Sequence, residues 1–222
     1  MQYRQLLDLL EENADSDYRT FQKRLLKNDS VNLIGVRIPT LRKIAKRFKG
    51  DLESLFAFPD DFYEVTFIKL TAASYLNFGE FTGCVDKCVA LIDNWATCDC
   101  FSPKCIAKNR DGFLLYIDKY INSECEFYQR FSLTTLLHFY VEEAYLDKIF
   151  QTIKKANTGW YYVYMAVAWL VAEVLAKYYR QGIEFLKSGV LDVKTHNKAI
   201  QKANESFRLS EEQKKYLKEI KR

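Results

Sequence analysis

The sequence has few residues that break regular structure, with eight glycines and three prolines among its 222 residues. A β-sandwich or barrel needs many tight turns, which glycine and proline commonly supply, so this scarcity argues against all-β folds. Hydrophobic residues make up 49% of the chain and aromatic residues 15%, enough apolar surface for a sizeable core. The composition therefore favours helices.

Long hydrophobic runs are also missing. The longest apolar stretch, Val163–Ala176, contains Glu173 and is too short to cross a bilayer. The N-terminal segment Met1–Asp17 is amphipathic and acidic, without the apolar region of a signal peptide. We therefore expect a cytoplasmic protein that does not use a membrane and keeps its six cysteines as reduced thiols.

Signals for metal and cofactor binding are weak. The chain has only two histidines, His138 and His196, and no Cys-x-x-Cys motif. The cluster of Cys98, Cys100 and Cys105 does not have the spacing of a zinc finger or ribbon. The sequence also has no glycine-rich phosphate loop and no nucleophile elbow. We expect no metal and no cofactor.

Apolar residues recur at helical spacing along most of the chain. The segment Leu41–Phe48 has the full i, i+3, i+4, i+7 pattern. Pro39 suits the first turn of a helix, and Ser210 with Gln213 has the pattern of a capping box. The predicted helices span residues 3–14, 16–27, 39–49, 51–57, 60–77, 80–93, 95–106, 110–121, 123–139, 143–156, 160–178, 180–188, 195–206 and 210–221.

The short loops between these helices predict antiparallel neighbours, and no linker divides the chain. We predict one domain over residues 1–222. A period near 40 residues fits HEAT-type repeats, although the repeats resemble one another weakly. The predicted fold is an all-α α-solenoid of antiparallel helix pairs with a concave basic groove, and a globular bundle is the alternative.

The net charge of +4 conceals two basic segments. Gly35–Lys49 holds six lysines or arginines and no acid, and Lys194–Arg222 holds nine against four glutamates. Such segments are typical of a nucleic-acid-binding face, and an ordinary solvated helix face is the alternative.

Four residues could carry chemistry. Trp95 and Asp99 are four residues apart, so a helix places the indole and the carboxylate on one face. Trp169 and Arg130 each lie within an apolar helical pattern. Taken singly, each has an ordinary structural explanation: core packing for the tryptophans, a helix cap for Asp99, and pairing with an acid for Arg130.

Five segments in order along the chain carry a resemblance to a known family. They are Gly35–Lys46, Ile92–Trp95 with Cys98–Asp99, Arg130–Phe131, Tyr161–Trp169 and Thr195–Lys202. Together they resemble the DNA alkylation repair, AlkD-like, family of HEAT-repeat DNA glycosylases. The resemblance implies an α-solenoid that holds duplex DNA on a concave basic face and excises N3- and N7-alkylated purines.

The resemblance also implies roles for individual residues. The family's catalytic aspartate falls on Asp99, its two site tryptophans on Trp95 and Trp169, and its phosphate-contacting arginine on Arg130. A family aromatic near the N-terminus aligns loosely with Phe21. A family position three residues after the second tryptophan is often basic or polar, and here it is Ala172.

The expected partner is double-stranded DNA carrying alkylated purines, bound by a monomer. Phosphate contacts are expected from the basic segments, which position a duplex without reading its sequence. The predicted DNA-binding residues are Arg37, Arg42, Lys43, Lys46, Arg47, Lys194, Lys198 and Lys202. Two alternatives stay open: a non-catalytic binder of damaged or branched DNA, and a protein-interaction scaffold.

Overall fold

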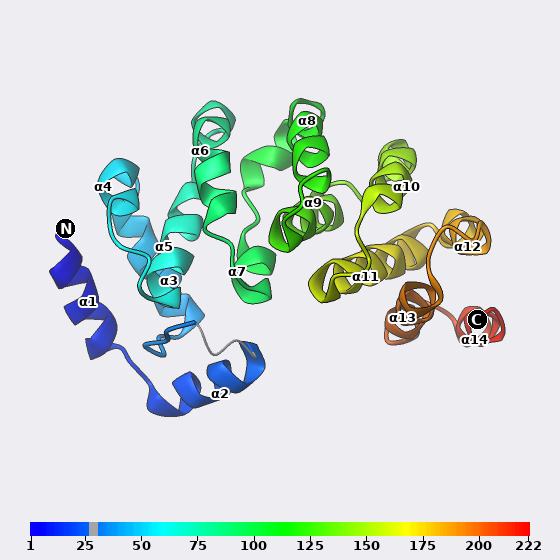
Figure 1. Ribbon diagram of the computed structural model, residues 1–222, viewed down its shortest axis with the longest axis horizontal. Coiled ribbons are helices and arrows are strands. Elements are labelled where there is room, and N and C mark those ends of the chain that lie inside the picture. Colours follow the sequence, from blue (N-terminus) through cyan, green and yellow to red (C-terminus); the bar gives the residue numbers. More distant parts are fainter. Residues whose placement is uncertain (27–30) are drawn as a thin grey trace. The chain divides into compact units, whose positions relative to one another are not determined.

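The chain is all-α in the computed structural model, which describes residues 1–26 and 31–222 (Figure 1). The described residues form fourteen α-helices, three short 3-10 helices and no β-strand. Each of the fourteen predicted helices has a counterpart. Lys27, the last residue predicted for the second helix, lies outside the described residues.

The chain divides into two compact units, residues 1–108 and 109–222. The first contains α1 (Tyr3–Glu12), α2 (Ser16–Leu26), α3 (Ile38–Ala45), η1 (Lys46–Phe48), α4 (Leu52–Phe56), α5 (Tyr63–Ala73), α6 (Phe78–Ala90), α7 (Trp95–Cys100) and η2 (Lys104–Lys108). The second contains α8 (Arg110–Ile121), α9 (Glu126–Phe139), η3 (Glu143–Tyr145), α10 (Leu146–Lys155), α11 (Tyr161–Lys177), α12 (Tyr179–Lys187), α13 (Val193–Asn204) and α14 (Glu211–Glu219). The single domain predicted over 1–222 stays a prediction.

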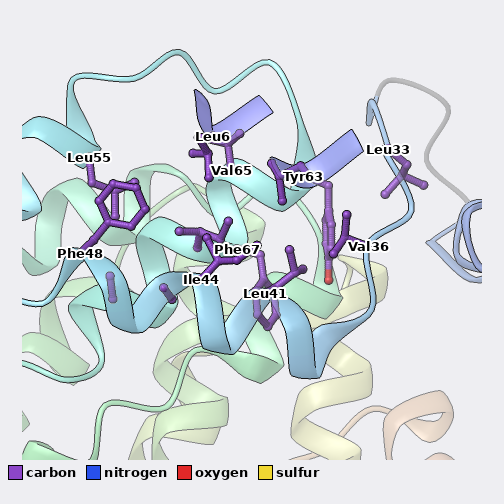
Figure 2. Close-up of a cluster of buried hydrophobic side chains, with 14 of the residues drawn as sticks. Leu6, Leu33, Val36, Leu41, Ile44, Phe48, Leu55, Tyr63, Val65 and Phe67 are labelled. Carbon is purple, nitrogen blue, oxygen red and sulfur yellow. The ribbon is translucent and has the colours of Figure 1, made fainter. Parts of the chain in front are cut away.

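Helix α5 is the centre of the first unit. It contacts α3, α4, α6 and α7, and all its residues but Thr71 are buried. Its apolar side chains pack against those of α1 and α3, among them Leu6 and Leu41 (Figure 2). A helix that is buried on all sides shows little amphipathic pattern, as α5 does, so its position comes from packing rather than from one apolar stripe.

The segment before α3 is fixed by a buried carboxylate. Glu64 of α5 is fully buried and accepts hydrogen bonds from the backbone N–H groups of Ile34, Gly35 and Val36, at 3.0, 2.7 and 3.3 Å. Gly35 has a φ of +100°, and a Cβ there would lie 2.6 Å from the Cβ of Arg19. Glycine is therefore required where the basic segment enters α3.

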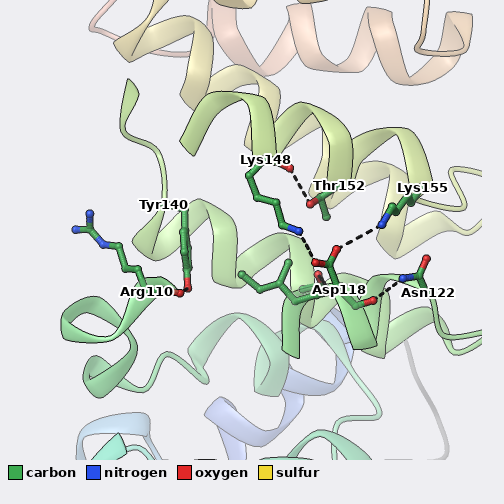
Figure 3. Close-up of polar contacts among 9 residues, drawn as sticks. Arg110, Asp118, Asn122, Tyr140, Lys148, Thr152 and Lys155 are labelled. Carbon is green, nitrogen blue, oxygen red and sulfur yellow. Dashed lines mark hydrogen bonds and ion pairs between the residues drawn. The ribbon is translucent and has the colours of Figure 1, made fainter. Parts of the chain in front are cut away.

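Helix α11 has the corresponding place in the second unit. It contacts α9, α12 and α13, and ten of its seventeen residues are buried. In the same unit, polar contacts join α8 to α10. Asp118 of α8 pairs with Lys148 and Lys155 of α10, and its backbone carbonyl accepts from Asn122 (Figure 3).

Several predicted boundaries differ from the structure by three residues or more, and two of these differences have a clear physical cause. The helix predicted from residue 60 begins at Tyr63, because the preceding segment is held in a loop by the ammonium of Lys69, which donates to the carbonyl of Phe58 and the carboxylate of Asp60. The helix predicted over 95–106 ends at Cys100, since the chain leaves the helical region at Phe101, where ψ is 89°. A short 3-10 helix, η2, follows.

Candidate functional site

Helix α7 carries two of the four candidate residues, Trp95 and Asp99. Its start is fixed by Asn94, whose side-chain oxygen accepts from the backbone N–H of Thr97 at 2.9 Å. The hydroxyl of Thr97 donates back to the carbonyl of Asn94 at 3.0 Å. These bonds satisfy groups that a helix start otherwise leaves unpaired. Asp99, which the sequence left open as a helix cap, lies in the last turn and does not cap α7.

The helical spacing of Trp95 and Asp99 is confirmed, so the indole and the carboxylate are one turn apart. Trp95 is half-buried and packs against the core of the first unit. Asp99 is also half-buried. The core therefore fixes the indole while part of the neighbouring carboxylate remains accessible to water.

Helix α3 brings a basic residue near the thiol of Cys100, the residue that follows Asp99. Burial raises the pKa of the Cys100 thiol, the positive charge of Arg42 lowers that pKa, and the negative charge of Asp99 raises it. Arg42 and Asp99 thus both lie near the same thiol, although they are 57 residues apart in the sequence. Both α3 and α7 pack on α5, which explains the approach.

Arg130, on α9 of the second unit, is buried, with 5% of its surface exposed. Its guanidinium donates to the backbone carbonyl of Tyr162 at 2.6 Å and lies 5.8 Å from the centre of that ring. Glu126 accepts from the backbone N–H of Tyr162 at 2.6 Å. Arg130 therefore joins α9 to the start of α11, a contact that its position in the sequence did not predict.

Trp169 lies in the middle of α11 and is half-buried. Its ring meets that of His138 edge-on at 6.4 Å. It also lines a cavity of about 220 Å³, together with Ala172, Lys202 and Arg208. The structure thus brings Trp169 together with Lys202, one of the predicted DNA-binding residues.

The other predicted DNA-binding residues lie mostly in solvent. Five of them are exposed: Arg42, Lys43, Lys46 and Arg47 on α3 and η1, and Lys194 on α13. Lys198, also on α13, is half-buried. The ammonium of Lys194 lies 3.8 Å from the centre of the Tyr164 ring. Cations at such positions keep most of their hydration and can exchange it for phosphate.

Arg37 differs from the other predicted cations because an acid of the same unit neutralises it. Its guanidinium pairs with Asp15 at 2.6 Å and stacks on Tyr18, 5.0 Å from the ring centre. The backbone N–H of Tyr18 and the guanidinium of Arg37 hold the pKa of Asp15 below its usual value. Phe21, the loosely aligned aromatic, lies 6.4 Å from Tyr18 and is 58% exposed.

Sequence reasoning missed two polar residues near Trp169. The guanidinium of Arg208 donates two hydrogen bonds to the carboxylate of Glu173, at 2.7 and 2.5 Å. The hydrogen bonds from Arg208 lower the pKa of Glu173. The two residues are 35 apart in the chain, so only the packing of α11 against α13 brings them together.

The part of the chain that the structure describes also lacks two kinds of feature. Nowhere in it do three or more metal-ligating side chains form a group that could hold a metal ion. None of its helices has the length and apolar character that crossing a membrane requires.

Comparison with known proteins gives the family. No curated protein matches the chain. The sequence matches the DNA alkylation repair enzyme family over residues 6–207, which includes α7, α9, α11 and α13 and all four candidate residues. The chain belongs to the DNA alkylation repair enzyme family.

Proposed function

We propose that the protein is a DNA glycosylase that hydrolyses the N-glycosidic bond of N3- and N7-alkylated purines in duplex DNA. The observation that carries the proposal is the placement of Trp95 and Asp99 one turn apart on a capped helix, in a chain that matches a DNA repair family over residues 6–207. The proposed enzyme is monofunctional and uses no metal or cofactor.

The chemistry suits a carboxylate that acts without a general acid. Alkylation at N3 or N7 gives the purine a positive charge, so the base leaves with the electron pair of the C1′–N9 bond and becomes neutral. The sugar becomes an oxocarbenium-like cation, as in glycoside hydrolysis. Asp99 would stabilise this cation and orient the water that attacks C1′ and then loses its proton.

The aromatic residues would act on the same cationic species. An indole face attracts a cation by about 0.5–2 kcal/mol, so Trp95 and Trp169 would favour the charged base and the charged sugar. Arg130 is proposed to bind a phosphate of the damaged nucleotide. One of its donors bonds to the carbonyl of Tyr162, which fixes the guanidinium at the start of α11, and a guanidinium binds phosphate by charge-assisted hydrogen bonds.

The proposal extends to the binding surface. HEAT-like antiparallel pairs forming an α-solenoid would supply a concave basic groove for the duplex. The exposed cations of α3, η1 and α13 would neutralise phosphates, with Lys202 doing so next to Trp169. We propose a monomer that acts in the cytoplasm, and on the nucleoid when bound to DNA.

Release of free base from methylated DNA tests the proposal. Wild-type protein is incubated with duplex DNA carrying N7-methylguanine or N3-methyladenine, and the released base is quantified by mass spectrometry. We expect free methylated base and an abasic strand that breaks only after alkali treatment. Strand breakage without alkali would contradict a monofunctional enzyme, and absence of free base would contradict the glycosylase.

A non-catalytic binder of damaged or branched DNA is the second candidate. Two observations favour it: Arg130 is buried against its own chain, and residue 172, beside Trp169, is an alanine with no polar group for DNA. Salt-sensitive DNA binding by a wild-type protein that releases no base would support this alternative.

A further inference from the structure

The loop between α13 and α14 holds a phenylalanine fully in solvent. Phe207 is 101% exposed, whereas the next most exposed large apolar side chain among the described residues, Leu115, is 62% exposed. Apolar side chains are normally at least partly covered, because covering them removes apolar surface from water. The ring of Phe207 touches little of its own chain and is available to a partner.

Neighbouring residues on both sides fix this exposure. Arg208 is anchored to Glu173 by two hydrogen bonds of 2.7 and 2.5 Å, and its backbone N–H donates to the hydroxyl of Ser206 at 3.2 Å. Leu209 is buried, and Ser210 begins α14 with a capping box. The loop is therefore tied to α11 and α14 directly after Phe207, so the ring is presented from a supported backbone.

The surroundings of Phe207 are polar rather than apolar, and they contain acids as well as cations. Its two chain neighbours, Ser206 and Arg208, line the cavity that also contains Trp169, Lys202 and the acids Glu173 and Glu205. Arg208 pairs with Glu173, so these two charges offset each other. Lys202 makes no ion pair among the described residues. An anionic partner would therefore find an available ammonium close to an exposed aromatic ring.

An apolar protein partner fits this surface less well. The other strongly exposed apolar side chains near α13 are at its start, Val190 before the helix and Val193 in its first turn, whereas Phe207 follows its last turn. A helix of twelve residues is about 18 Å long, so these side chains do not form one apolar patch with Phe207. An exposed aromatic ring near an ammonium that makes no ion pair suits nucleic-acid contact, in which rings stack on bases and cations hold phosphates.

We propose that Phe207 is a DNA-contacting residue that inserts at a base step and stacks on a nucleobase, while Lys202 binds an adjacent phosphate. Apolar side chains inserted in this way unstack a step and bend the duplex. The inference rests on the proposed function, because it takes DNA as the partner. It adds a stacking residue that is not among the four candidates.

The test measures binding of the full-length protein to a fluorescently labelled duplex, by anisotropy over a series of salt concentrations. Stacking on one base predicts that Phe207→Ala weakens binding about tenfold. Phe207→Leu, which keeps an apolar side chain without a ring, should weaken it to a similar extent, and Phe207→Tyr should bind like wild type. The salt dependence should not change, because no charge is removed.

Two controls separate stacking from damage to the fold. Leu115→Ala, at an exposed apolar position on α8, should bind DNA like wild type. The thermal midpoint of Phe207→Ala should equal that of wild type, because the ring buries almost nothing. Wild-type affinity in Phe207→Ala would overturn the inference, and wild-type affinity in Phe207→Leu would overturn stacking as its basis.

The outcomes also distinguish this inference from the proposed function. If wild-type protein releases methylated bases and Phe207→Ala binds DNA as tightly as wild type, only the proposed role of Phe207 is wrong. If wild-type protein binds no DNA at low salt, both the proposed function and this inference are wrong.

Discussion

Helices α7 and α11 each carry one of the candidate tryptophans, but they are held in different ways. Helix α7 has six residues and starts with an Asn94 cap, and it presents Trp95 in its first turn. Helix α11 has seventeen residues, ten of them buried, and presents Trp169 from its middle. Isolated helices shorter than about 12 residues are marginal in water, so α7 depends on its cap and its contact with α5, and α11 on packing throughout its unit.

This difference indicates how each candidate residue is positioned. Asp99 depends on a short helix whose start rests on a single amide side chain. Trp169 lies on the helix around which the second unit is packed. Substitutions should therefore damage the two regions by different routes.

The largest effect on stability is expected from the core of α11. Leu170 is fully buried, so Leu170→Ala should lower the free energy of unfolding by about 2–5 kcal/mol through lost burial and a cavity. Chemical denaturation measures the change. Leu115→Ala, at an exposed site in the same unit, should change it by less than about 0.5 kcal/mol. Equal losses of unfolding free energy in Leu170→Ala and Leu115→Ala would contradict the claim that the packing of α11 stabilises the second unit.

A smaller loss of stability is expected at the start of α7. Asn94→Ala removes the cap and should cost about 1 kcal/mol, whereas Asn94→Ser, whose hydroxyl oxygen can still accept from Thr97, should cost less. Because α7 has few other supports, Asn94→Ala should slow base release by more than the loss of folded protein explains. Unchanged base release by Asn94→Ala would show that α7 is held without its cap.

The smallest effect is expected where α8 meets α10. Burial alone would raise the pKa of Asp118, but hydrogen bonds and charge from Lys148 and Lys155 outweigh it and hold the pKa below the usual 3.8. The carboxylate therefore stabilises the fold above that value and loses this contribution as the pH falls through the lowered pKa. Since the ion pair of Asp118 with Lys148 is partly exposed, Asp118→Asn should lower the free energy of unfolding by about 0.5–1 kcal/mol at pH 7.

Denaturation of wild type and Asp118→Asn between pH 7 and pH 2 measures this effect. The difference between them should shrink as the pH falls. A difference that persists at pH 2 would show that the role of Asp118 in the second unit is not electrostatic.

Local chemistry made the helices predictable from the sequence. Pro39 lies in the first turn of α3, and Ser210 with Gln213 forms the expected capping box of α14. The early end of α7 could also have been predicted, because Pro103 disfavours a helical conformation in the residue before it.

Contacts between distant segments were not predictable. The buried Glu64 looks like any acid in the first turn of a helix, and its three backbone partners lie about thirty residues earlier. The pairs Arg37–Asp15 and Arg208–Glu173 depend in the same way on packing between elements. The spacing of Trp95 and Asp99 could be predicted because both lie on one helix, whereas the burial of Arg130 against Tyr162 could not.

Single-turnover release of N7-methylguanine by the Asp99→Asn variant tests the central claim most directly. Asp93→Asn is the matched control, because it removes one negative charge near the same helix and keeps an oxygen for the amide of Asn94. We predict a rate at least about a hundredfold lower for Asp99→Asn, with DNA affinity unchanged, and a rate near wild type for Asp93→Asn. A wild-type rate in Asp99→Asn would contradict the assignment of the catalytic carboxylate to α7.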